Sequence, residues 1–107
     1  MSSKEIYNVV KLVPKPGKFN EVSDAFKTLS KYVQDNEPKT QIYFAVQPQG
    51  TEELVIVEKY TDSQNLKDHA VSQAFKQFSE TIGGLLAQAP EIKRAAFASG
   101  FEGRVKL

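Results

Sequence analysis

The hydrophobic residues of this chain change their spacing after Pro14-Lys15-Pro16-Gly17, and that change restricts the fold more than any other feature. Before it, residues 6–13 are mostly apolar and β-branched, which predicts a strand. From Lys18 onward, apolar side chains recur at intervals of three and four residues, which predicts a helix of about five turns. The stripe consists of Phe19, Val22, Phe26, Leu29 and Val33. Because Pro38 disfavours helical backbone at the residue before it, we expect this helix to end near Asn36.

Three further stretches are rich in β-branched and aromatic residues, and each of them predicts a strand. They cover residues 41–47, 54–60 and 91–99. Pro48-Gln49-Gly50-Thr51 separates the first two and is typical of a turn, so we expect these two strands to form a hairpin.

Residues 62–82 have helical periodicity, but one continuous helix would turn Lys67 toward its apolar side. A break near Ser72, which is a good N-cap residue, removes that conflict. We therefore expect two short helices, at 62–70 and 72–82. The inner side of the first would carry Leu66, His69 and Ala70.

The expected order is βαββααβ, which is typical of an α+β domain of ferredoxin-like type. Such a domain has a four-stranded antiparallel sheet with helices on one face. The 107 residues suffice for one hydrophobic core. We therefore expect residues 1–107 to form a single domain, with its core at about 6–100 and a tail at 101–107.

Two of the expected strands are apolar on consecutive residues, whereas a strand with one solvated face should alternate. These runs are Leu54 to Val57 and Ala95 to Ala98. One interpretation is that both faces of the sheet are covered, the second by another copy of the chain. This predicts a homodimer in which two sheets meet face to face. The other interpretation is that these strands simply have high β-propensity.

The composition excludes several classes of function. With no cysteine and one histidine, the chain cannot form disulfides, iron–sulfur sites or two-histidine metal sites. Phosphate-binding and dinucleotide-binding glycine motifs are missing, so we expect no cofactor. Fourteen basic and 13 acidic residues leave a formal charge of +1, which does not indicate a nucleic-acid partner. Strand 54–60 also lacks the glycine and alternating aromatics of the RNA-recognition module.

The sequence has no apolar run approaching the roughly 18 residues that a membrane-spanning helix needs, and no export signal. We therefore expect no membrane association and a cytoplasmic protein. The last residues, Arg104-Val105-Lys106-Leu107, match the Ser-Lys-Leu peroxisomal address only in part, because valine replaces the small polar residue.

Several protonatable side chains fall among aromatic residues. His69 is the one side chain whose usual pKa lies near neutrality, and the expected helix break turns it toward Glu58 and Tyr60 at the end of a strand. It is either a buried structural histidine or a catalytic one. Tyr7 and Tyr43 either pack in the sheet or line a site. Arg94 in the last strand pairs either with Glu58 or with an anionic or enolic ligand.

The stretch from Leu54 to His69, followed by Ser72-Gln73-Ala74-Phe75-Lys76, resembles the signature of the antibiotic biosynthesis monooxygenase domain family. In that family a strand ends in Glu plus an aromatic, a short helix ends in Leu-x-x-His, and a Ser-x-x-Phe helix start follows. Pro16-Gly17-Lys18 is similar to the family's Pro-Gly opening before its first long helix. The resemblance covers about residues 6–100.

This resemblance implies a dimeric α/β barrel that oxidises anthrones, quinols or similar polyphenols with molecular oxygen, without metal or flavin. It implies that His69 is the base or proton shuttle, that Glu58 orients it, and that Tyr60 is a donor at the pocket wall. Further pocket positions expected from geometry are Tyr7, Tyr43, Phe75 and Arg94.

Haem-degrading relatives use an Asn, a Trp and a His. This chain has no Trp, its His69 falls at the Trp position and Gln77 replaces the haem-binding His, so we do not expect haem degradation. Two functions remain open. One is a cofactor-independent monooxygenase acting on a small aromatic substrate. The other is a non-catalytic dimeric barrel that binds a small hydrophobic ligand or acts in a stress response.

Overall fold

The computed structural model describes residues 4–104 and contains the predicted elements in the predicted order. Their bounds differ from the expected ones by one residue at most, except at the end of the last strand. The elements are β1 (Ile6–Leu12), α1 (Phe19–Asn36), β2 (Thr40–Val46), β3 (Leu54–Tyr60), α2 (Ser63–Ala70), α3 (Gln73–Gly83) and β4 (Glu91–Ala95).

The four strands form one sheet in the order β2-β3-β1-β4, and all neighbouring pairs are antiparallel. The hairpin between β2 and β3 turns at Gly50, whose φ of 77° is a left-handed conformation that glycine adopts without a steric penalty. The predicted ferredoxin-like α+β fold is therefore confirmed.

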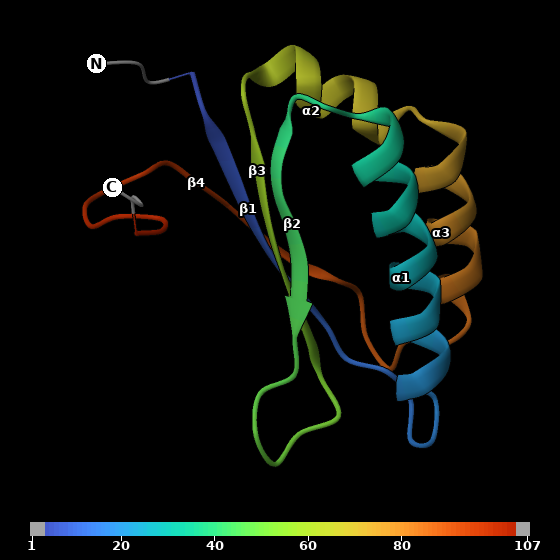
Figure 1. Ribbon diagram of the computed structural model, residues 1–107. Coiled ribbons are helices and arrows are strands. Elements are labelled where there is room, and N and C mark those ends of the chain that lie inside the picture. Colours follow the sequence, from blue (N-terminus) through green and yellow to red (C-terminus); the bar gives the residue numbers. More distant parts are fainter. Residues whose placement is uncertain (1–3, 105–107) are drawn as a thin grey trace.

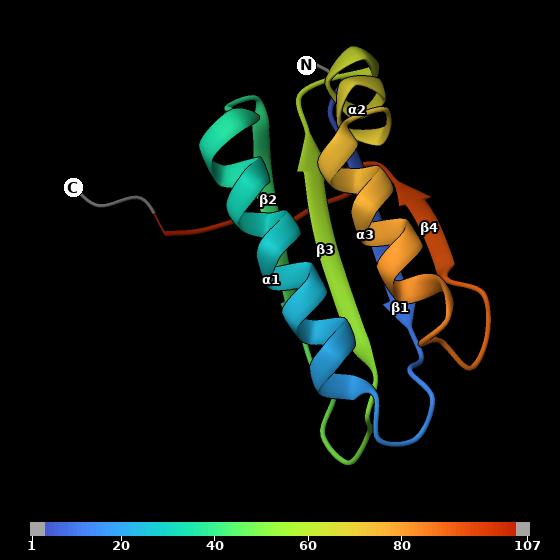
Figure 2. The same cartoon turned by 90° about the vertical axis from the view of Figure 1, so that its right-hand side faces the viewer.

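Helices α1 and α3 lie side by side across one face of the sheet, and α2 lies at its upper end (Figures 1 and 2). The stripe predicted for α1 packs against that face: Val22, Phe26, Leu29 and Val33 are all buried. The core is completed from the strands and α3 by Val10, Leu12, Leu54, Ile56, Phe78 and Ile82. Among residues 4–104, no helix combines the length and apolar character needed to cross a bilayer.

The predicted break between α2 and α3 is confirmed, and side-chain caps define it. Ser72 Oγ accepts a hydrogen bond from the Phe75 N–H at 3.1 Å and donates one to the His69 carbonyl at 2.8 Å. Asp62 caps α2 by accepting a hydrogen bond from the Asn65 N–H at 2.9 Å. The break changes the direction of the helical chain, so that His69 and Phe78 both face the sheet.

The last strand ends at Ala95, four residues before the predicted end at Ser99. The reason is the partner strand. Ala95 pairs with Tyr7, and β1 begins at Ile6, so a longer β4 would find only one more residue of β1 to pair with. The chain then bends away on the side of the sheet opposite the helices (Figure 1). The partial peroxisomal match extends over residues 105–107, which lie outside the described residues.

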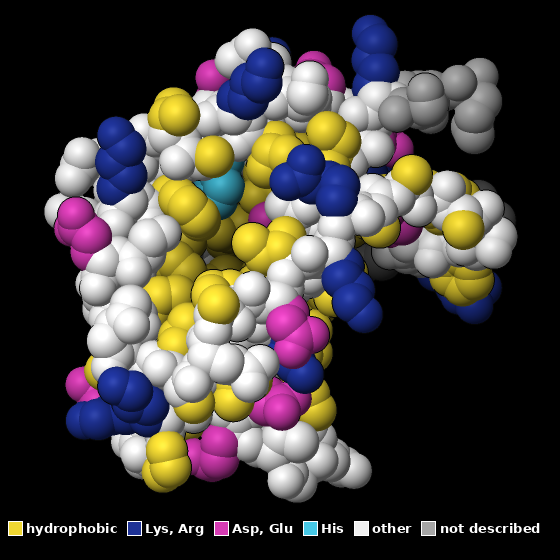
Figure 3. All heavy atoms as spheres, turned by 180° about the vertical axis from the view of Figure 1, so that it is seen from behind, with side chains coloured by type: hydrophobic (Ala, Val, Ile, Leu, Met, Phe, Trp, Pro, Cys, Tyr) yellow, Lys and Arg dark blue, Asp and Glu magenta, His cyan; other side chains and the backbone are white. Residues whose placement is uncertain are grey.

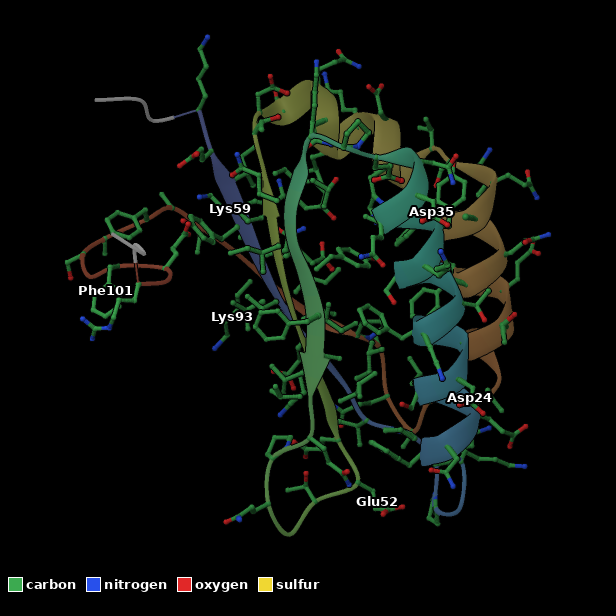
Figure 4. All side chains as sticks on the ribbon, in the orientation of Figure 1. Asp24, Asp35, Glu52, Lys59, Lys93 and Phe101 are labelled. Atoms are coloured by element: carbon green, nitrogen blue, oxygen red, sulfur yellow. The ribbon has the colours of Figure 1, made fainter. Side chains whose placement is uncertain are left out.

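No described helix covers the second face of the sheet. Lys59 and Lys93 point away from the helices, toward the side where Phe101 lies (Figure 4). The C-terminal segment is held there by Glu102, which accepts hydrogen bonds from Lys59 Nζ at 2.6 Å and from the Tyr7 hydroxyl. Much of this face stays open, and its apolar side chains are about half exposed at Phe44 and Val46.

We expect Ser72→Ala to lower the free energy of unfolding by about 1 kcal/mol, because it leaves the first turn of α3 without its cap. Chemical denaturation followed by circular dichroism measures this change. Ser30→Ala is the matched control, since the Ser30 hydroxyl bonds only the Lys27 carbonyl inside α1. Equal stability of the two variants would contradict a capping role for Ser72.

Candidate functional site

Four polar side chains form a row across the sheet on the face that the helices cover. Each strand contributes one of them, and in strand order the row reads Tyr43, Glu58, Asn8 and Arg94. Glu58 and Asn8 are buried next to the core residues Ile56 and Val10, which lie two residues away on the same strands. Polar groups buried in an apolar layer need hydrogen-bond partners, and we take this row as the starting point of the candidate site.

A cavity of about 240 Å³ lies between this row and helices α2 and α3. All four polar side chains of the row line it, together with His69 and Ser79. The rest of the wall is apolar and consists of Val10, Leu12, Ile56, Leu66, Ala70, Phe75, Phe78, Ile82, Pro90 and Ile92. Figure 3 shows the hollow from behind, with the histidine side chain among hydrophobic ones.

His69 lies at one end of the cavity, and both of its ring nitrogens are hydrogen-bonded. Nδ1 lies 3.0 Å from Glu37 Oε1 and 3.2 Å from Oε2, and Nε2 lies 3.2 Å from the Tyr43 hydroxyl. Only 2% of His69 is exposed. A histidine buried this fully between a carboxylate and a phenol is placed for proton transfer.

Three aromatic rings surround His69. Its ring centroid lies 5.1 Å from Phe75, 5.3 Å from Tyr43 and 5.6 Å from Tyr60. Tyr43 also stacks on Phe26, with centroids 5.2 Å apart and an interplanar angle of 20°. Because close packing restricts rotamers, these contacts hold the imidazole and the Tyr43 hydroxyl in fixed positions.

Glu58 is paired with neutral groups. The Tyr60 hydroxyl donates to its Oε1 at 2.6 Å, and the Asn8 amide donates to the same oxygen at 3.3 Å. Burial raises the pKa of the Glu58 carboxyl, although these hydrogen bonds and the charges of His69 and Arg94 oppose the shift. The carboxyl is therefore a stronger proton acceptor than an exposed glutamate.

Within the row, Arg94 is linked to Glu58 through Asn8. Its Nε donates to Asn8 Oδ1 at 2.6 Å, and Asn8 in turn donates to Glu58. Of the two alternatives for Arg94, pairing with Glu58 or with a ligand, the first is not made directly, because Asn8 lies between the two side chains. Arg94 is itself exposed, so its charge lies where an entering ligand would meet it.

The expected orientation of His69 by Glu58 is not what the structure shows. Glu37, at the end of α1, makes that contact instead, because the turn after α1 brings its side chain against α2. Tyr60 is fully buried and donates to Glu58 rather than into the cavity. It therefore contacts Glu58 from the core side and does not line the cavity.

Tyr7 is not brought to the cavity. Side chains alternate along a strand, and the buried Asn8 of β1 faces the helices, so Tyr7 faces the opposite side. There it contacts Glu102 and the Lys59 ammonium. Of the other expected pocket residues, Tyr43, Phe75 and Arg94 all line the cavity.

Three site residues were missed by the sequence analysis. Glu37 precedes Pro38 at the end of a helix and carries no local signal of its partner 32 residues away. Asn8 had a signal, since it is the one polar residue in the alternating set that continues with Val10 and Leu12. Asn65, whose amide donates to the Thr40 hydroxyl that in turn donates to Glu37, had a weaker one, because it stands four residues before His69 on the same helix face.

A larger groove of about 600 Å³ lies between α1 and α3 on the outer surface. It is shallow, and its polar lining consists of exposed side chains such as Glu21, Asp24 and Gln77. We place the site in the smaller cavity because that is where buried ionisable groups meet. Over residues 4–104, no three His, Asp or Glu side chains gather in a way that could hold a metal ion.

The cavity thus combines an apolar wall with two proton-accepting groups, His69 and Glu58, and with the donors Tyr43 and Arg94. Such a site suits the removal of a proton from a weakly acidic organic ligand and the stabilisation of the resulting oxyanion.

Comparison with protein families gives one match. The model of the antibiotic biosynthesis monooxygenase family matches residues 5–81, which contain all of the site described above except Ile82 and the residues of β4 and the loop before it. A comparison with curated proteins found no match.

Solved structures resemble the chain over most of its length. A Caulobacter crescentus protein that carries this family's name is 26% identical, with a TM-score of 0.85 and coverage of 91% of this chain and 92% of that one. A conserved Methanosarcina mazei protein is 24% identical, with a TM-score of 0.79 and coverage of 87% and 92%. Rv0793 of Mycobacterium tuberculosis is 16% identical, with a TM-score of 0.84 and coverage of 92% and 99%.

The family match covers well over half of the chain, and the fold agrees with that of the solved relatives. The chain therefore belongs to the antibiotic biosynthesis monooxygenase family.

Proposed function

We propose that the protein is a cofactor-independent monooxygenase that oxidises a small aromatic quinol or anthrone-like substrate with molecular oxygen. The observation that carries this proposal is the placement of His69, buried between Glu37 and Tyr43 at the end of an apolar cavity. Membership of the family supports the same reaction type.

The chemistry requires an electron-rich substrate. Removal of a phenolic or enolic proton gives an anion that can pass an electron to oxygen. For an anthrone-like substrate, the ring CH₂ becomes C=O, one oxygen atom of O₂ enters the product and the other leaves as water with the two hydrogens. An apolar wall protects the anion from solvent, and fixed donors stabilise its oxygen.

The cavity dimensions favour a small substrate. About 240 Å³ lies just below the roughly 300–1,000 Å³ typical of ligand pockets, so it fits a compact molecule. The guanidinium of Arg94 faces the hydroxyl-rich or anionic part of such a molecule, and Phe75 and Phe78 contact its rings.

We also propose that two chains associate through the uncovered face of the sheet. Val9, Phe44 and Val46 are between 39% and 49% exposed there, and Phe97 and Phe101 follow in the C-terminal segment. Contiguous exposed apolar surface of this kind is typical of a protein interface. The arrangement would place the two cavities on the outer sides of a pair of sheets.

Purified, metal-stripped protein should consume oxygen with anthrone or a hydroquinone as substrate. His69→Ala should lower the rate by about 10²–10⁴-fold, which is the usual contribution of a general base. An oxygen electrode and product analysis measure both. Asp68→Ala, which changes an exposed neighbour on the same helix, should leave the rate unchanged.

Two results would contradict the monooxygenase proposal. Saturable binding of these compounds without any product would instead support a ligand-binding protein of the same fold. Unchanged turnover in a correctly folded His69→Ala variant would remove His69 from the mechanism.

Light scattering at micromolar concentration should give twice the mass of one chain. Phe44→Lys should shift the protein toward the monomer, because it introduces a charge into the apolar face of the sheet. Tyr32→Lys is the matched control, since Tyr32 is an exposed aromatic residue on the helical side. A wild-type monomer, or an equal effect of both variants, would argue against this interface.

Because of Glu58, we expect the free energy of unfolding to fall as the pH rises. Its pKa is raised above the ordinary value of 4.5, so the folded state holds a proton that the unfolded state releases. Stability therefore falls as the pH increases from about 4.5 through the folded-state pKa. Glu58→Gln should remove that decline, whereas Glu52→Gln, on the exposed hairpin loop, should keep it. Parallel stability curves for wild type and Glu58→Gln, measured by urea denaturation, would refute this assignment.

A further inference from the structure

We propose that His69 acts on the substrate through Tyr43, and that Glu37 is the positioning residue that fixes the imidazole for this task. The three side chains then form a proton relay from the cavity to the end of α1. This inference rests on the proposed function for the identity of the substrate, but its hydrogen bonds can be tested in the free protein.

The directions of the hydrogen bonds follow from the donors available. An ionised carboxylate only accepts, and Glu37 Oε1 also accepts from the Thr40 hydroxyl at 3.2 Å. His69 Nδ1 must therefore carry the hydrogen, and in the neutral ring Nε2 is left with its lone pair. The Tyr43 hydroxyl then donates to Nε2. No free nitrogen of His69 remains to meet a substrate directly.

Glu37 is held in place from several directions. Its backbone N–H donates to the Val33 carbonyl at 2.8 Å and so caps the end of α1. The Asn65 amide donates to Thr40 Oγ1 at 3.1 Å, which extends the hydrogen-bond chain back to α2. The side chains of His69 and Glu37 are only 3% and 10% exposed. This anchoring fixes the tautomer of the ring and stabilises the positive charge that it gains on taking a proton.

Tyr43 is the member of the relay that offers a ligand its hydroxyl oxygen, because the ring of His69 also lines the cavity but both of its nitrogens are hydrogen-bonded. It lines the cavity as the first residue of the polar row, and its stacking on Phe26 fixes the direction of its hydroxyl. Burial, together with the carboxylates of Glu58 and Glu37, raises the pKa of Tyr43. The hydroxyl therefore stays protonated at rest and passes a proton on only as it receives one.

The transfer is a balanced exchange of protons. The substrate hydroxyl gives its proton to the Tyr43 oxygen while the Tyr43 proton moves to His69 Nε2. The substrate becomes an oxyanion, Tyr43 ends neutral, and His69 becomes an imidazolium beside the Glu37 carboxylate. No bond other than the O–H and N–H bonds changes, and no electron is transferred in this step.

The single histidine of the chain makes the tautomer directly measurable. In ¹⁵N-labelled protein, at a pH where the ring is neutral, Nδ1 should give the shift of a protonated nitrogen and Nε2 that of an unprotonated one. Glu37→Leu should move the population toward the other tautomer, whereas Tyr43→Phe should not. Glu80→Leu, an exposed change on α3, is the control. A wild-type ring protonated at Nε2 would overturn the proposal.

A second measurement follows the proton without any oxygen chemistry. Bound 4-nitrophenol changes colour when it ionises, so its spectrum reports whether the cavity has removed its proton. Wild-type protein should increase the ionised fraction of the bound probe, and both Tyr43→Phe and His69→Ala should abolish the increase. Ionisation that persists in Tyr43→Phe but disappears in His69→Ala would show direct contact with His69 and overturn the relay. Absence of oxygen uptake would contradict the proposed function alone.

Discussion

The capped break at Ser72 is the interaction on which both the core and the site depend. Its hydroxyl bonds the last turn of α2 and the first turn of α3 at once, so it sets the direction in which the second helix leaves the first. With that direction, Phe78 and Ile82 seal the core while His69 faces the sheet from the preceding helix. In one continuous helix, either His69 or the pair Phe78 and Ile82 could face the sheet, but not both.

The site divides its polar groups into two connected sets. One joins Glu37, His69 and Tyr43 at the α2 end of the cavity, and the other joins Tyr60, Glu58, Asn8 and Arg94 across the strands. Tyr43 and Glu58 lie opposite each other in neighbouring strands, so the two sets meet at the cavity wall. Every buried side-chain polar atom in the described residues has a partner, which explains how an apolar layer accommodates so many of them.

The elements of this fold were predictable because their signals are local. The α1 stripe, the caps at Asp62 and Ser72 and the hairpin turn each lie within a few neighbouring residues. Contacts between distant segments were harder to predict. The pairing of His69 with Glu37 depends on the path of the chain after α1, which the sequence does not encode as a pattern. The early end of β4 likewise depends on where its partner strand begins.

The two faces of strand β1 make different contacts. On the cavity side, Asn8 connects Arg94 to Glu58, and on the opposite side Tyr7 contacts Glu102 of the C-terminal segment. Inserting or deleting one residue in this strand would exchange the two sides. A tyrosine would then enter the cavity, and the link across the strands would be lost. Changes in length during evolution should therefore be confined to the loops, and β1 should vary only by substitution.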